Sequence, residues 1–194
     1  MSSSGTSHGT SRGWERLGTL PGVAFVLVAL NGLYLALVAF GNITDFGTNQ
    51  AFVQHVLSMD TTNFGAPQGT GLDPDVMWRA IDNETVQRIA YLGIIVWETI
   101  TAVVLLAAVA IAIRERESDA GFRKARALAT LGLAMLILLF FGGFIAIGGE
   151  WFQMWKSSAW NGLDPAFRNS VLALLTLVLL HLPSSQWGPL DADA

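Results

Sequence analysis

Apolar residues gather in four long runs along the chain, at residues 17–40, 89–113, 125–147 and 165–182. A helix needs about 20 predominantly apolar residues to cross the hydrocarbon core of a bilayer, and each run reaches or approaches that length. We therefore expect an all-α protein, in which a four-helix transmembrane bundle forms one membrane domain over residues 17–182.

The charges of the polar segments between the runs predict on which side of the membrane each segment lies. Five Lys and Arg residues lie in the short segment 114–126, whereas the much longer segment 41–88 holds only two. Lys and Arg are retained on the cytoplasmic side of short loops. This asymmetry predicts outward-facing segments at 41–88 and 148–164, a cytoplasmic N-terminus at 1–16 and a cytoplasmic tail at 183–194. The N-terminus is rich in Ser, Thr and Gly, so we expect it to be disordered.

The outward segments carry short helical patterns of their own. Apolar residues recur at three- and four-residue spacing within 52–59, which indicates an amphipathic helix, and 148–162 has a similar pattern. We expect both to be short interfacial helices that form a lid over the outer end of the bundle. Tryptophan favours the membrane interface because its ring is apolar and its N–H is polar. Four tryptophans are the predicted lid aromatics, Trp78, Trp151, Trp155 and Trp160.

Two polar side chains, Asn31 and Glu98, lie deep within the apolar runs. Each stands about nine residues from the outward end of its run, hence about 13 Å deep, and Thr176 reaches a similar level. An ionised carboxylate at such a depth costs about 2.5–3.5 kcal/mol. We predict a buried polar cluster of Asn31, Glu98 and Thr176, which either holds the helices together or serves as a proton or cation site.

A second candidate site lies on the outer face. His55 and Met59 are four residues apart, so that their side chains share one helix face, and Asp60 follows directly. Imidazole, thioether and carboxylate groups can together bind copper or another transition ion, and Glu150 could complete the ligand set. The alternative is that His55 makes a hydrogen-bonding cap and Met59 belongs to the apolar face of the helix.

Charge and composition exclude several classes of function. The net charge is −4, whereas nucleic-acid binding requires a basic surface, and the absence of cysteine excludes thiolate metal sites. The chain contains no phosphate loop, dinucleotide fingerprint, HExxH or CxxC motif. The sequence therefore favours a protein that is not an enzyme, with no predicted cofactor other than the transition metal considered above.

Several strings of residues resemble a family of predicted small bacterial integral membrane proteins of unknown function. They are NITD at 42–45, FVQHVLSMDTT at 52–62, WRAI at 78–81, GGEWFQMW at 148–155 and WN at 160–161, together with the apolar run that contains Glu98. The resemblance extends from about Val23 to Leu182. It implies a four-span protein of the bacterial cytoplasmic (inner) membrane and supplies no catalytic residue.

These features predict an accessory or structural bundle with an outward-facing aromatic lid over the buried polar cluster. Two alternatives remain: a transport component for protons, cations or small solutes that uses Glu98, and metal binding on the outer face. The expected partners are the lipid bilayer and either a second copy of the chain or another membrane protein. Four spans are few for a monomeric pathway, so transport would require an oligomer.

Overall fold

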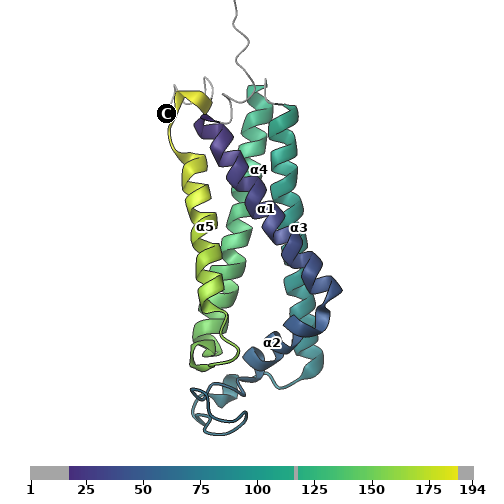
Figure 1. Ribbon diagram of the computed structural model, residues 1–194, viewed down its shortest axis with the longest axis vertical. Coiled ribbons are helices and arrows are strands. Elements are labelled where there is room, and N and C mark those ends of the chain that lie inside the picture. Colours follow the sequence, from purple (N-terminus) through teal and green to yellow (C-terminus); the bar gives the residue numbers. More distant parts are fainter. Residues whose placement is uncertain (1–17, 116–117, 188–194) are drawn as a thin grey trace, which may run out of the picture.

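The computed structural model describes residues 18–115 and 118–187, and all regular structure in this part of the chain is helical. Four long helical segments pack side by side: α1 (Leu20–Thr44), α3 (Glu84–Arg114), α4 (Asp119–Ile137) with its direct continuation η3 (Leu138–Trp151), and α5 (Leu163–His181). The helix α2 (Phe46–Ser58) lies across one end of them (Figure 1). The predicted all-α four-helix bundle is thus confirmed.

Three single turns complete the described elements, η2 (Met77–Arg79), η4 (Met154–Lys156) and η5 (Ser185–Trp187). The predicted disordered segment 1–16 and most of the predicted tail 183–194 lie outside the described residues.

Three helices begin at side-chain caps that the local sequence supplies. The side chains of Thr19, Asn83 and Ser118 accept hydrogen bonds from backbone N–H groups in the first turns of α1, α3 and α4, at 3.1–3.2 Å. Such caps satisfy N–H groups that have no partner within the helix. The long helices therefore start at polar positions just before the apolar runs.

The outer surfaces of the long helices are apolar. Leu37 on α1, Val103 on α3 and Phe167 on α5 are each more than 60% exposed. Among the described residues, four helices are long and apolar enough to cross a membrane, and in each about a third or less of the most apolar stretch is buried inside the protein. Surfaces of this kind fit a bundle whose outer faces meet lipid, since a soluble helix would present polar residues there.

Two predicted helix ends are wrong. The first apolar run predicts an end at residue 40, but α1 continues through Gly41 and Asn42 to Thr44. The third run predicts an end at residue 147, but η3 continues through Gly148 and Gly149 to Trp151. The predicted second lid helix over 148–162 is also wrong, because this segment contains only the end of η3 and the single turn η4. The lid therefore consists of α2 and irregular loops.

Glycines allow the helices to approach closely at the centre of the bundle. A Cβ atom on Gly32 of α1 would lie 3.1 Å from the Cβ of Leu105, and one on Gly132 of α4 would lie 2.6 Å from its Cδ2. Leu105 is completely buried between these two helices. Small residues are typical of such seams in membrane proteins, because there packing rather than hydrophobic burial drives association.

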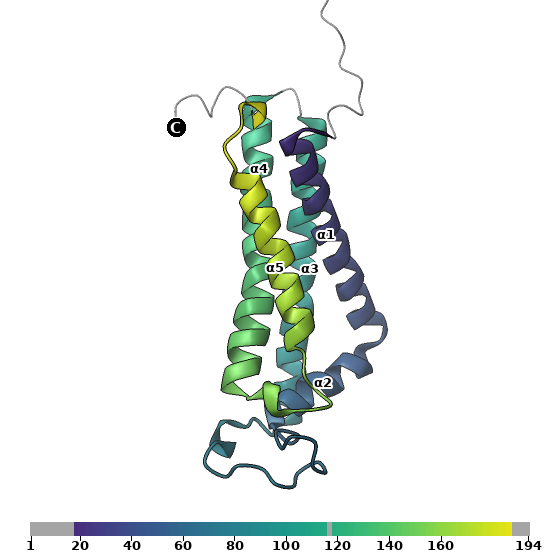
Figure 2. The same cartoon turned by 60° about the vertical axis from the view of Figure 1, so that its left-hand side comes forward.

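The helix α1 crosses the bundle obliquely. Hydrogen bonds join it to η5 and to α5, from Leu20 to Gln186 and from Asn31 to Thr176, and towards the lid it separates from α5 (Figure 1). The helix α2 spans the region where they diverge (Figure 2). At this end of the bundle a cavity is lined by residues of α1, α2, α3, η3 and the start of α5.

Candidate functional site

Glu98 is the most deeply buried acidic side chain among the described residues. It lies on α3, is 3% exposed, and accepts a hydrogen bond of 2.7 Å at Oε2 from Nδ2 of Asn42 on α1. Asn42 is itself only 5% exposed. A short hydrogen bond between two buried groups on different helices fixes α1 and α3 relative to each other.

Asn42 links Glu98 to the lid. Its Oδ1 accepts a hydrogen bond of 2.6 Å from Nδ2 of Asn49, which lies on α2. The hydroxyl of Tyr91 on α3 donates to the backbone oxygen of Asn42 at 3.4 Å. Asn49 thus donates to Asn42, and Asn42 donates to Glu98, so that the carboxyl group is the final acceptor of a chain of hydrogen bonds that begins in the lid.

A cavity of about 250 Å³ adjoins this chain of hydrogen bonds. Its walls come from α1, α2, α3, η3, the loop that leads into α5 and the first turn of α5. The polar members of the wall are Tyr34, Asn42, Asn49, Tyr91, Glu98 and Asn161. Among the described residues that line it, Glu98 is the only Asp, Glu, Lys, Arg or His.

The structure divides the predicted polar cluster in two. Asn31 donates a hydrogen bond of 3.1 Å to Oγ1 of Thr176, which joins α1 to α5. Gly32, the next residue of α1, packs against Leu105, which lies about two turns of α3 beyond Glu98. Asn31 and Thr176 therefore form a pair of their own, and Glu98 binds Asn42.

Asn42 is absent from the predicted polar cluster because the Gly41–Asn42 dipeptide resembles a helix end. The sequence predicts an outward segment from residue 41, where an asparagine needs no buried partner. The available signal was the helical spacing of Asn31, Leu35, Ala39 and Asn42, which places a second polar residue on the inner face of α1 if the helix continues.

A second cavity, of about 210 Å³, adjoins the first and has mainly apolar walls. It lies between α2, α3 and η3, and the two cavities share the wall residues Phe52, Val53, Ile94 and Phe144. The rings of Phe52 and Phe144 stack with their centroids 6.3 Å apart. These two rings thus stand between a polar and an apolar space.

The π-helix η3 borders both cavities. Its Phe140 and Phe144 line the polar one, and its Gly143 and Ile147 line the apolar one. A π-helix of 14 residues is long, since most occur as single-turn bulges, often at functional sites. A Cβ on Gly143 would meet no other atom within 4 Å, so the apolar cavity extends to the backbone of η3.

The outer-face candidates do not converge on one point. Nδ1 of His55 lies 2.9 Å from Oδ1 of Asp60, whose Oδ2 accepts from Gln68 at 2.7 Å. Met59 is fully buried in a left-handed conformation that ends α2, and Glu150 is exposed at the end of η3. Within the described ranges no three His, Cys, Asp or Glu side chains are grouped as a metal ion would require.

The predicted lid aromatics lie at this same end of the bundle. Trp78 and Trp151 are 69% and 46% exposed, and the guanidinium of Arg79 lies 5.5 and 5.2 Å from their ring centroids. Trp155 is also exposed, whereas Trp160 stacks on His55 with ring centroids 4.6 Å apart. Trp78 and Trp151 pack edge to face with ring centroids 5.6 Å apart, Trp155 packs against Phe64, and Trp160 packs within the lid.

Comparison with the curated proteins and with the solved structures gives no match. The model of one protein family, described as predicted small integral membrane protein (DUF2165), matches residues 22–183. That range contains all four candidate spans except the first two residues of α1, and it also contains both cavities and the lid. The chain thus belongs to this family of small integral membrane proteins of unknown function.

Proposed function

We propose that this protein is an accessory membrane bundle that binds a small lipid-soluble molecule in the cavity beside Glu98, beneath the lid formed by α2. One observation carries the proposal: a carboxyl group 3% exposed lines a cavity of about 250 Å³. Its Oε1 has no hydrogen-bond partner among the described residues.

The size and the walls of the cavity favour a ligand over simple helix packing. Protein interiors contain few voids larger than a water molecule, and a cavity of about 150 Å³ is already large enough to bind benzene. A buried polar group is costly unless it is hydrogen-bonded. A carboxyl group that served only to join two helices would be enclosed by its partners, whereas Glu98 borders an open space.

Transport of protons or cations is the second candidate, and it also would use Glu98. A pathway requires further polar or ionisable groups beyond the first one. On the side away from the lid, however, the bundle is closed at Leu105, and Asn31 and Thr176 are bonded to each other. These features favour a binding site that opens on one side over a route through the bundle.

We further propose that the lid faces outward and that both termini are cytoplasmic, in the cytoplasmic membrane of a bacterium. The support is the basic cluster at the opposite end, where Arg114, Arg123, Lys124 and Arg126 lie near the loop between α3 and α4. Cations of short loops remain on the cytoplasmic side. An outward lid would place the Glu98 cavity in the outer half of the bilayer.

Saturable binding of radiolabelled n-decanol to the protein in phosphatidylcholine nanodiscs tests the binding function. We expect one site per chain above the uptake of empty nanodiscs. Val38→Trp should abolish the site, since Val38 lines the cavity. Val103→Trp is the matched control, because Val103 is 61% exposed on the lipid-facing surface. Absence of saturable binding to the unmodified protein, or its retention in Val38→Trp, would refute the proposal.

A further inference from the structure

We propose that the occupant of the site is an amine-headed amphiphile, whose ammonium group binds Glu98 and whose hydrocarbon chain fills the adjoining apolar cavity beneath α2. This inference rests on the proposed binding function and specifies the chemistry of the ligand.

Charge complementarity identifies the head group. The polar cavity contains one acidic side chain and, among the described residues that line it, no Lys, Arg or His. Asn42 donates to one oxygen of Glu98, and the other oxygen has no donor within the described part of the chain. An ammonium group supplies three donors and a positive charge. An anionic head group would instead face Glu98 with no cation to offset the repulsion.

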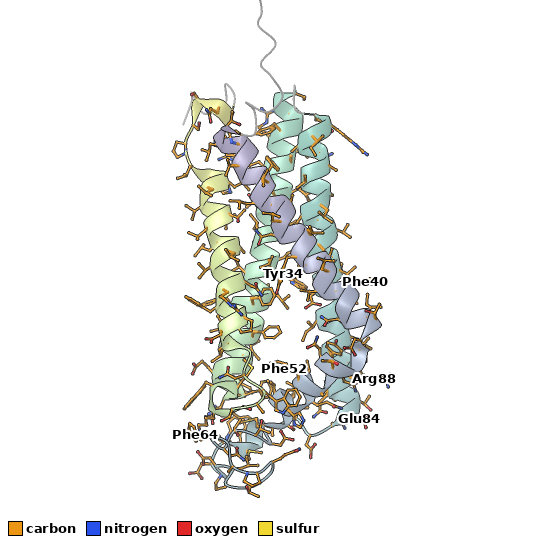
Figure 3. The ribbon with its side chains drawn as sticks, viewed as in Figure 1. Tyr34, Phe40, Phe52, Phe64, Glu84 and Arg88 are labelled. Carbon is orange, nitrogen blue, oxygen red and sulfur yellow. The ribbon has the colours of Figure 1, made fainter. Side chains whose placement is uncertain are left out.

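The position of the opening indicates entry from the lipid phase. Asn169 on α5 donates a hydrogen bond of 2.8 Å to the hydroxyl of Tyr34 on α1. Among the described residues this is the hydrogen bond between the two helices that lies nearest the lid, and beyond it the helices separate (Figure 1). Figure 3 shows Tyr34 and Phe52 at opposite ends of this separation. Tyr34 lines the cavity and is 42% exposed.

The residues next to this opening on both helices are lipid-facing. Leu37 of α1 and Phe167 of α5 are 61% and 62% exposed. A molecule that enters here must therefore dissolve in the bilayer and carry a polar group suited to Glu98, which is the definition of an amphiphile.

The second cavity accounts for the hydrocarbon chain. Its volume of about 210 Å³ exceeds the roughly 150 Å³ that suffices for benzene. It meets the polar cavity at Phe52 and Phe144, whose rings can turn aside by rotation about their side-chain bonds. A chain that passes between these rings reaches the open space in front of Gly143.

The head group is tested with n-decylamine and n-decanol as probes of equal chain length. Binding is measured in phosphatidylcholine nanodiscs, with each dissociation constant referred to the probe concentration in the bilayer. We expect decylamine to bind about ten- to a hundredfold more tightly than decanol, the ratio that a charge-assisted hydrogen bond provides. Glu98→Gln should remove this preference while decanol still binds.

Thr176→Val is the matched control for the head group, because it deletes another hydrogen bond between helices outside both cavities. It should leave the preference for decylamine unchanged. Equal affinity for the two probes in the unmodified protein, or a preference that survives Glu98→Gln, would overturn the inference. In that outcome saturable decanol binding that Val38→Trp abolishes would still support the proposed function, whereas absence of saturable decanol binding would refute both.

The position of the chain is tested by filling the apolar cavity. Gly143→Leu places a side chain in that space, whereas Gly93→Leu is a matched control at an exposed glycine with nothing within 4 Å of its Cβ position. Gly143→Leu should weaken decylamine binding at least about tenfold, since several buried methylene groups lose their place, and should leave n-butylamine unaffected. Unchanged decylamine binding in Gly143→Leu would show that the chain lies elsewhere.

Discussion

The hydrogen bond between Asn42 and Glu98 makes a specific prediction about the stability of the bundle. Asn42→Leu should destabilise the unmodified protein. The same replacement should destabilise the Glu98→Leu variant by a smaller amount. The reason is that the single change leaves a buried carboxyl group without its donor, whereas the double change removes donor and acceptor together.

The magnitude follows from the geometry. Both side chains are at most 5% exposed, and their nitrogen and oxygen atoms are 2.7 Å apart. An unsatisfied buried polar group costs about 1–3 kcal/mol, which is the expected effect of Asn42→Leu. Coupling energies of hydrogen bonds between membrane helices average about 0.6 kcal/mol and reach about 1.7 kcal/mol. A short, fully buried bond should lie at the upper end, at about 1–1.7 kcal/mol.

The assay is equilibrium unfolding with sodium dodecyl sulfate in mixed micelles, followed by far-ultraviolet circular dichroism. It measures the free energy of unfolding of the unmodified protein, the two single variants and the double variant. The pair Asn31 and Thr176 provides a control cycle, because its hydrogen bond is longer, at 3.1 Å, and only partly buried. Its coupling should lie near the average. If the double replacement of Asn42 and Glu98 equals the sum of the two single effects within about 0.3 kcal/mol, the bond does not hold the helices together and the reasoning is wrong.

Three further predictions concern the seam, the lid and the topology. Gly132→Ala should destabilise the bundle by about 1–3 kcal/mol in the same unfolding assay, because the new Cβ would lie 2.6 Å from Leu105; an unchanged free energy would show that α4 can shift. Asp60→Ala should speed amide hydrogen exchange in the loop 60–70 about fivefold, since loss of the partly exposed contacts of its carboxylate with His55 and Gln68 costs about 1 kcal/mol; unchanged exchange would mean that the loop is held by other contacts. The chain has no cysteine, so a single introduced cysteine can report the topology. In intact cells Thr70→Cys should react with an impermeant maleimide and Ala120→Cys should not. The opposite pattern would invert the proposed orientation.

The coarse fold follows directly from the sequence. Apolar runs of membrane-spanning length predict the four long helices, and the periodicity of residues 52–59 predicts most of α2. These features are predictable because each depends on local composition and spacing alone. The position of Glu98 in an apolar run likewise marks it as a candidate, because ionisable residues within membrane spans are rare and most often functional.

The partner of Glu98 could not be found by counting depth. That count measures distance from an assumed helix end, and α1 and α3 both extend beyond their apolar runs. Counting from the observed ends does not find the partner either, because Asn31 lies 13 residues from Thr44 and Glu98 lies 14 residues from Glu84, so the two still have matched depths. The oblique path of α1 explains the failure, since inclined helices do not keep equal depth along their length (Figure 2).

The two wrong helix ends have a common physical cause. Glycine ends helices in soluble proteins because water or a tertiary contact satisfies the carbonyl groups that the last turn leaves free. Near the hydrocarbon core no water is present, so an interrupted helix would leave several backbone groups unpaired, each at a cost of several kcal/mol. The helix therefore continues through Gly41 in α1 and through Gly148 and Gly149 in η3. In both places the continuation builds the candidate site: it carries Asn42 to Glu98, and it extends the wall of the apolar cavity to Gly148. Glycines in such a chain are thus better interpreted as sites of close approach or open space than as helix ends.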